Sequence, residues 1–150
     1  MSNPHAVDHR PAIDRLCAWF ESLSPSSLAR LDEFYTADAR FKDPFNEVQG
    51  RPAIARIFEH MFRSLHTPHF VVTSRLVDGP QCFLAWEFRF RFKRFDTSTE
   101  QVVRGGSHLR LAADGRITDH RDYWDAAEEL YEKLPMLRVL MRWLRRRAAT

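Results

Sequence analysis

The first third of the chain has the periodicity of amphipathic helices. Apolar side chains recur with i, i+3, i+4 spacing, which predicts a helix from Pro11 to about Leu23 and a second helix after Ser24. Proline is favoured in the first turn of a helix, and serine supplies a capping hydroxyl. The apolar positions of the second helix are Leu28, Leu31, Phe34 and Tyr35.

A short strand and a third helix follow. Residues 39–42 are predicted to form a strand that ends at Asp43-Pro44, because proline disfavours helix in the residue before it and cannot extend a central strand. A new helix is expected to begin at Gly50-Arg51-Pro52. Its apolar stripe consists of Ile54, Ile57, Phe58, Met61, Phe62 and Leu65.

From Phe70 onward the period of the pattern changes from 3.6 to 2. Turn sequences rich in Asp, Gly and Ser separate four predicted strands over residues 70–77, 82–95, 101–111 and 116–124. In the second of these, aromatic residues at 86, 88, 90 and 92 alternate with charged residues, which is typical of a strand with one buried face. A last helix is predicted over residues 126–147, interrupted near Pro135.

This order of elements predicts an α+β fold. Helices come first and a sheet follows, so we expect the N-terminal helices to pack on one face of a strongly curved, mostly antiparallel sheet. A bent sheet closed by helices leaves a cone whose mouth can hold a small ligand. The 150 residues divide into a flexible N-terminus (1–10), one domain (11–125) and an extra C-terminal helix (126–150).

Composition excludes several classes of protein. With 44% hydrophobic residues, 5 Gly and 8 Pro, the chain should fold rather than stay disordered. No apolar stretch approaches the roughly 20 residues of a membrane span, and no signal peptide is visible, so a cytoplasmic location is expected. Cys17 and Cys82 lack the spacing of a disulfide framework and are expected to be core thiols. No nucleotide or phosphate motif is present, and we expect no cofactor.

The net charge of +3 comes from the end of the chain. Before Arg138, 18 Lys and Arg stand against 20 Asp and Glu, and the five remaining arginines lie in residues 138–147. They surround a leucine-rich stripe, which indicates an amphipathic helix that packs on the domain or contacts an anionic membrane surface. Packing is the favoured interpretation, because arginine near a helix C-terminus complements the helix dipole. A nucleic-acid partner is not expected.

Two segments resemble a known superfamily. YTADARFKDPFNEVQGRPAIARIFEHMF (35–62) resembles the signature stretch of ketosteroid isomerase and SnoaL-like proteins in the nuclear transport factor 2-like superfamily, and DGRITDHRDYWD (114–125) resembles their last hairpin. The resemblance implies a cone-shaped fold, a pocket for a hydrophobic small molecule and a homodimer formed through the sheet. The superfamily includes isomerases, cyclases, dehydratases, epoxide hydrolases and non-catalytic binders, so the fold alone does not identify a reaction.

By this resemblance Asp43 matches the aspartate that moves a proton alpha to a carbonyl in ketosteroid isomerases. The alternative is that Asp43 only caps the turn at the end of its strand. The positions of the family's oxyanion hole hold Trp19 and Ser107, which offer one N–H and one O–H rather than the strong donor pair of the family. Ketosteroid isomerisation is therefore not expected.

The last strand carries a second candidate group. His120, Asp122 and Trp124 share one face, because side chains alternate along a strand. The resemblance implies that this face points into the cone and that an acidic residue on a late strand takes part in SnoaL-like cyclisation. His120 and Asp122 could form an acid/base pair in which the carboxylate fixes the imidazole tautomer. The alternative is a structural polar network.

Aromatic residues are expected to surround the pocket. Most such stripes are simply core, but a cavity among them would take a hydrophobic ligand. With Trp19, Ser107 and Trp124, the candidate ligand-binding residues are Phe45, Phe58, Phe62, Trp86, Phe88 and Phe90. Histidines 60, 66 and 69 lack metal-ligand spacing, so no metal is expected.

We therefore predict a SnoaL-like protein with an apolar small-molecule pocket. The expected chemistry is that of an isomerase, cyclase or dehydratase, with Asp43, His120 and Asp122 as acid/base residues. The alternative is a non-catalytic ligand-binding or dimerisation module of the same fold.

Overall fold

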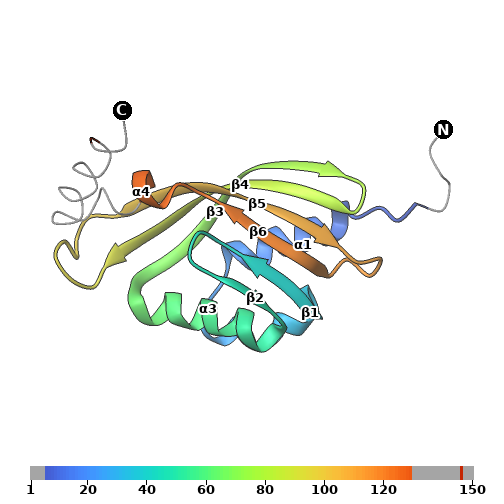
Figure 1. Cartoon of the computed structure of the whole chain (residues 1–150), viewed down its shortest axis with the longest axis horizontal. Coiled ribbons are helices and arrows are strands. Elements are labelled where there is room, and N and C mark those ends of the chain that lie inside the picture. Colours follow the sequence, from blue (N-terminus) through green and yellow to red (C-terminus); the bar gives the residue numbers. More distant parts are fainter. Residues whose placement is uncertain (1–5, 130–145, 147–150) are drawn as a thin grey trace.

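Six strands form one curved sheet in the order β2-β1-β6-β5-β4-β3 (Figure 1). The structure, a computed structural model, describes residues 6–129 and residue 146. Strand β1 (Tyr35–Lys42) runs parallel to β6 (Ile117–Tyr123), and the other neighbouring strands are antiparallel. The remaining strands are β2 (Glu47–Gln49), β3 (Leu65–Asp78), β4 (Gln81–Phe92) and β5 (Gln101–Leu111).

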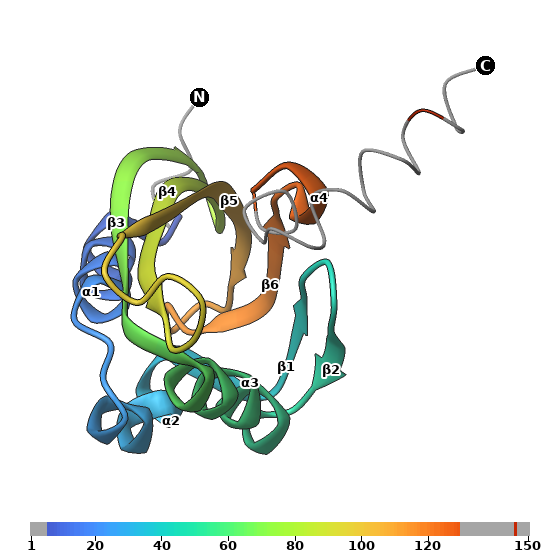
Figure 2. The ribbon, with the colours of Figure 1, turned by 90° about the vertical axis from the view of Figure 1, so that its left-hand side faces the viewer.

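The helices lie along the open side of this sheet. Figure 2 shows the sheet curving from β3 through β4, β5 and β6 to β1, with α1 and α3 on the side that the sheet leaves open. The helices that precede β3 in the chain are α1 (Arg10–Glu21), a 3-10 turn η1 (Ser26–Arg30), α2 (Leu31–Phe34) and α3 (Arg51–Ser64). This arrangement confirms the predicted α+β cone.

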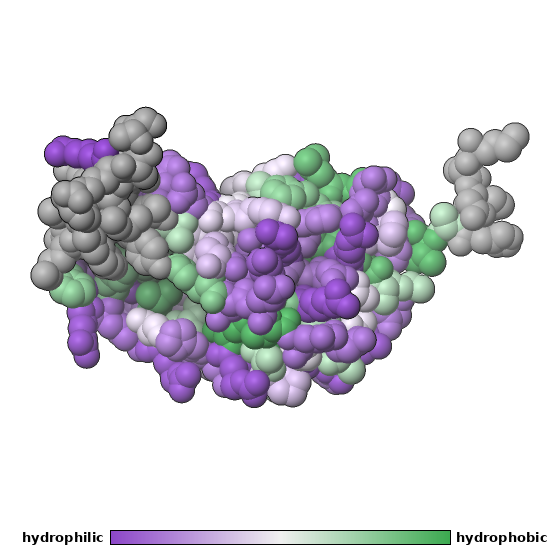
Figure 3. Space-filling view, in the orientation of Figure 1, coloured by the Kyte–Doolittle hydropathy of each residue, from purple (hydrophilic) through white to green (hydrophobic). Residues whose placement is uncertain are grey.

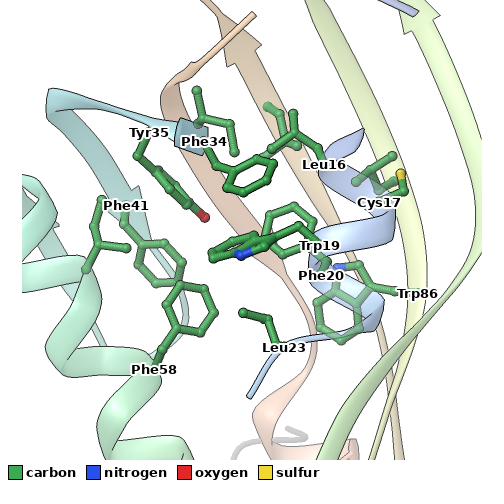
Figure 4. Packing of buried hydrophobic residues seen from close by; sticks show 14 of the residues in the cluster. Leu16, Cys17, Trp19, Phe20, Leu23, Phe34, Tyr35, Phe41, Phe58 and Trp86 are labelled. Atoms are coloured by element: carbon green, nitrogen blue, oxygen red, sulfur yellow. The ribbon is translucent and has the colours of Figure 1, made fainter. Parts of the chain in front are cut away.

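Aromatic side chains from the helices and the sheet meet in the core. Trp19 on α1 stacks on Phe34, with 4.6 Å between ring centroids, and contacts Phe58 edge-on (Figure 4). The Tyr35 hydroxyl points inward from the start of β1. Burial of this apolar area against the sheet stabilises the fold by about 25 cal/mol per Å² removed from water.

The predicted second helix is wrong at its end. Tyr35 fits the helical spacing of Leu31 and Phe34, but the helix stops at Phe34 and Tyr35 begins β1, four residues before the predicted strand. Tyr35, Ala39 and Phe41 are all buried on one face, and the register of β1 against β6 shifts between Tyr35 and Arg40. Packing of Tyr35 against β6 therefore outweighs the local helical pattern.

Strand β3 also starts earlier than predicted. Helix α3 passes directly into it at Leu65, whereas the sequence places Pro68 before the strand. Because β3 is an edge strand, it tolerates a proline that donates no hydrogen bond. The pairing of β3 with β4 shifts between His66 and His69, and Thr67 there has a positive φ of 49°.

The predicted C-terminal helix lies largely outside the described residues. Its first turn is present as α4 (Ala126–Glu129), where the Asp125 carboxylate accepts a hydrogen bond from the Glu128 amide. Among the residues that the structure describes, no helix has the length and apolar character needed to cross a membrane.

Candidate functional site

A cavity of about 290 Å³ opens between α3 and the inner face of the sheet. Its exposed members, Phe45, His60 and Ser64, mark the mouth, and its buried members, among them Phe41 and Trp86, form the inner end. Eight aromatic rings contribute to its walls: Phe41, Phe45, Phe58, Phe70, Trp86, Phe88, Phe90 and Trp124. The predicted aromatic stripe is thus partly cavity wall rather than wholly core.

A second, smaller space of about 30 Å³ continues inward. It shares Trp86 and Asp122 with the larger cavity and adds Ser107 and His120 to the wall. This volume suits about one water molecule or a methyl group. Of the described residues, Asp122 is the one carboxylate that lines both spaces.

Asp122 on β6 is held by two donors at one oxygen. The Ser107 hydroxyl donates to Oδ1 at 2.5 Å, and His120 Nε2 lies 2.7 Å from the same atom. The described residues donate no hydrogen bond to Oδ2. The side chain is 15% exposed and lines both spaces.

The imidazole of His120 is fixed from both sides. The tautomer of His120 that carries its proton on Nε2 donates this N–H to Asp122 Oδ1. Nδ1 then accepts from the Tyr35 hydroxyl at 2.7 Å. Burial, followed by the nearby charge of Asp122, raises the pKa of Tyr35 well above its ordinary value, which keeps this hydroxyl protonated.

Strand register explains why these groups meet. Ser107 on β5 lies directly opposite Asp122, and Phe41 on β1 lies opposite His120. Trp86 on β4 donates its indole N–H to the Ser107 oxygen at 2.9 Å. The result is a continuous hydrogen-bonded chain: Tyr35, His120, Asp122, Ser107 and Trp86.

Asp43 lies in the wall of the same cavity but in a different setting. Its Oδ1 accepts hydrogen bonds from the amide of Phe45 at 2.8 Å, the amide of Asn46 at 2.6 Å and the Asn46 side chain at 3.1 Å. Its Oδ2 accepts from the Asn46 side chain at 3.1 Å. The carboxylate thus closes the turn between β1 and β2, as the alternative interpretation of this residue expects.

Two candidate ligand contacts lie outside the cavity wall. Trp19 is 3% exposed in the core, and its indole N–H lies 3.4 Å from the Ser27 carbonyl oxygen. Phe62 lies on another side of α3, where it lines a surface hollow with Pro25 and Leu28. For both residues, spacing along the sequence predicted a position near the pocket. It could not predict the direction in which each side chain points.

The remaining candidates lie where the pattern placed them. His120, Asp122 and Trp124 share the inner face. Phe45, Phe58, Trp86, Phe88 and Phe90 line the cavity, and Ser107 lines the smaller space.

Tyr35 is the main member of the site that sequence reasoning missed. Its placement in a helix concealed the contact with His120. The alternation of Tyr35, Ala37, Ala39 and Phe41 with polar residues was the available signal, because it matches the period of a strand. Phe70 and Val103 are further wall residues that the pattern did not single out.

The outer face of the sheet offers a different environment. It is mostly hydrophilic where β1, β5 and β6 are seen in Figure 3, and it carries an open groove of about 560 Å³. Charged residues of both signs line this groove: Arg40, Lys42, Glu47, Arg110, Asp119 and Arg121. Within the described part of the chain, no group of three or more His, Cys, Asp or Glu side chains could hold a metal ion.

Solved structures share this architecture at low sequence identity. A protein described as a SnoaL-like polyketide cyclase from Shewanella putrefaciens aligns with a TM-score of 0.70 and 15% identity, over 85% of this chain and 96% of that chain. An LEH-like epoxide hydrolase from M. tuberculosis aligns with a TM-score of 0.67 and 15% identity, over 93% of this chain and 94% of that chain. A protein with a ketosteroid isomerase-like fold from Catenulispora acidiphila, in complex with trimethylamine, aligns with a TM-score of 0.66 and 18% identity, over 86% of this chain and 92% of that chain.

These similarities establish the fold and leave the reaction open, since proteins of different activity share it. No curated protein matches the sequence significantly. The family model of the SnoaL-like domain matches residues 16–120, which include Asp43, Ser107 and His120. The chain therefore belongs to the SnoaL-like domain family.

Proposed function

We propose that the protein is an acid/base enzyme of the isomerase, cyclase or dehydratase type, acting on a small, mostly apolar molecule. The observation that carries this proposal is the setting of Asp122: one carboxylate oxygen accepts hydrogen bonds from Ser107 and His120, the other accepts none from the described residues, and the side chain lines an aromatic cavity. A fixed carboxylate with one available oxygen can remove a proton from a bound molecule and return it to another atom.

The hydrogen-bonded chain fixes the geometry of this transfer. The Ser107 hydroxyl and the His120 N–H both donate to Oδ1, so Oδ2 is the atom that takes up the proton. Tyr35 holds the far side of the imidazole and prevents its rotation. Breaking the C–H bond leaves its electron pair on the substrate, where in an isomerase a conjugated carbonyl group of the substrate itself takes it up. The carboxyl group then gives the proton to a second carbon of the substrate and returns to its starting state.

This arrangement favours an enzyme over a non-catalytic module. Placing a carboxylate among aromatic side chains costs free energy unless its hydrogen bonds compensate for the lost water. A module that only binds an apolar ligand gains nothing from an incompletely bonded carboxylate oxygen at that position. A largely apolar pocket with a few convergent polar groups is typical of a ligand or active site.

Cavity size limits the substrate. A cavity of about 150 Å³ can hold benzene, so about 290 Å³ corresponds to roughly two such rings. We therefore propose a substrate with one or two rings, or an equivalent chain, rather than a four-ring steroid.

Asp43 is the weaker candidate for proton transfer. Both of its oxygens accept hydrogen bonds from Phe45 or Asn46, and these bonds close the loop at the cavity. We propose that Asp43 shapes the mouth of the site, while Asp122 acts on the substrate.

The test is hydrogen–deuterium exchange in small cyclic ketones and 1,3-diketones, followed by NMR in deuterated buffer. We expect the protein to accelerate exchange at the acidic C–H of at least one compound, and Asp122→Asn to lower that rate by about 10²–10⁴-fold. The exchange rate of Asp43→Asn should remain close to that of the unmodified protein. An Asp122→Asn rate equal to that of the unmodified protein would remove Asp122 from the mechanism.

A further inference from the structure

Two carboxylates lie in the cavity wall. Among the described residues that line it, Asp43 and Asp122 are the Asp or Glu residues, His60 is the one other titratable group, and none is Lys or Arg. Asp43 accepts four hydrogen bonds, from the amides of Phe45 and Asn46 and from the Asn46 side chain, and Asp122 accepts two. The described part of the wall thus places two acidic side chains, and no Lys or Arg, beside a bound ligand, which favours a positive over a negative ligand charge.

The hydrogen-bond donors at the inner end are already in use. The Trp86 indole N–H donates to the Ser107 oxygen. The Ser107 hydroxyl and the His120 Nε2–H both donate to Asp122. Among the described residues, the inner wall therefore offers a ligand a hydrogen-bond acceptor, the second oxygen of Asp122. The bound molecule must therefore supply the donor or the positive charge.

The aromatic walls complement such a charge. The face of an aromatic ring is electronegative, and tryptophan attracts a cation most strongly. Trp86 and Trp124 both line the cavity with Asp122, and Phe45 meets Trp124 at 5.5 Å between ring centroids in a T-shaped pair. Aromatic rings together with a carboxylate are the combination that binds ammonium groups.

We propose that this cavity selects an organic cation: an amine or quaternary ammonium group carried on an apolar ring or chain. The inference concerns the substrate class of the proposed function and rests on it only in taking the cavity as the ligand site. The ammonium group lies beside Asp122 and the tryptophan rings, and the apolar part fills the phenylalanine-lined remainder. Binding of this cation needs no proton transfer.

Three probes of similar size and shape test this selectivity. Phenyltrimethylammonium, tert-butylbenzene and benzenesulfonate differ in charge while keeping one phenyl ring and one compact substituent. Isothermal titration calorimetry with the full-length protein should give roughly tenfold tighter binding of the cation than of the neutral probe. The sulfonate should not bind. Equal affinity for cation and neutral probe, tighter binding of the sulfonate, or no binding of any probe would overturn the inference.

Variants distinguish charge recognition from simple apolar burial. Asp122→Asn should reduce the preference for the cation, whereas Asp119→Asn, on the outer face of the same strand, should leave it unchanged. Trp124→Leu keeps an apolar wall but removes the aromatic ring, so it should weaken binding of the cation more than binding of tert-butylbenzene. Equal weakening of both probes in Trp124→Leu would count against a cation site.

The outcome separates this inference from the proposed function. Cation-selective binding without any proton exchange would overturn the enzyme assignment and leave the ligand class standing. Exchange of neutral ketones that depends on Asp122, with no preference for the cation, would overturn the ligand class alone.

Discussion

Tyr35 is the side chain that connects the core to the candidate site. Its ring is fully buried between helix and sheet, and its hydroxyl is the partner of His120 Nδ1. The raised pKa of Tyr35 keeps it a donor at any ordinary pH. The orientation of His120, and through it that of Asp122, therefore depends on a residue that does not line the cavity.

Removing this hydroxyl gives a prediction at the scale of one residue. Tyr35→Phe leaves the buried Nδ1 of His120 without a donor, so the free energy of unfolding should fall by about 1–3 kcal/mol. Urea unfolding followed by circular dichroism measures the change. The control is Tyr123→Phe. Tyr123 is 47% exposed on the outer face, so removing its hydroxyl should change the free energy of unfolding by less than about 0.5 kcal/mol. Equal stability of Tyr35→Phe and the unmodified protein would refute the structural role of this hydrogen bond.

Sequence reasoning was most successful for residues on a strand whose face is set by alternation. It predicted that His120, Asp122 and Trp124 share a face, and the structure places all three on the inner side. It could not predict that Ser107 lies opposite Asp122, since register between strands depends on the whole sheet. For Asp43, the local Asp-Pro turn chemistry correctly indicated the hydrogen bonds that form.

A glycine on strand β5 leaves room for a side chain of the site. Gly105 lies opposite Trp86 in the β4–β5 pairing, and a Cβ atom there would come 2.6 Å from the Trp86 ring. The glycine therefore lets the indole lie close to β5, where its N–H reaches Ser107.

The prediction at this scale is that Gly105→Ala displaces the Trp86 ring. Such overpacking typically costs about 1–3 kcal/mol of stability. Phenylalanine lacks the indole atoms that would clash, so the cost should shrink when Gly105→Ala is made together with Trp86→Phe. Urea unfolding of the two single variants and the double variant measures this coupling. Additive effects of the two changes would contradict a direct clash.

Elements with strong periodicity were predicted well, and those fixed by distant contacts were not. The limits of β5 were predicted at Gln101 and Leu111, and α3 begins close to the predicted position. The hairpin strand β2 was missed, because its three residues gain their structure from pairing with β1. The early start of β1 likewise depends on its parallel partner β6, 82 residues away at the Tyr35–Ile117 pair.

For the whole molecule, the order of elements was enough to predict the α+β cone. The cavity was harder, because the same aromatic pattern fits a filled core, and only the three-dimensional packing shows that about 290 Å³ remains. The homodimer and the cytoplasmic location remain predictions from the sequence and its resemblance.

Global stability should depend on pH through the buried thiols. Burial, with a smaller effect of Cys17, raises the pKa of Cys82 to about 11 from 9.0. The folded protein therefore retains a proton that the unfolded chain loses. Stability from this group is complete below pH 9 and is lost as the pH rises toward 11, by roughly 1–3 kcal/mol.

Urea unfolding at several pH values between 8 and about 11 measures this dependence. In Cys82→Ala the fall in stability should be smaller, although Cys17 and Tyr35, whose pKa values are also raised, still contribute. A pH dependence that is unchanged in Cys82→Ala would show that Cys82 does not contribute it.

The most direct test of the central claim is the ratio of ketone exchange rates in Asp122→Asn and Asp43→Asn, measured by NMR under identical conditions. Both changes replace a carboxylate in the same cavity wall with an amide of equal size, so the ratio isolates the role of each oxygen pair. We predict that exchange persists in Asp43→Asn and falls by about 10²–10⁴-fold in Asp122→Asn. Loss of exchange in Asp43→Asn, with full activity in Asp122→Asn, would contradict the account.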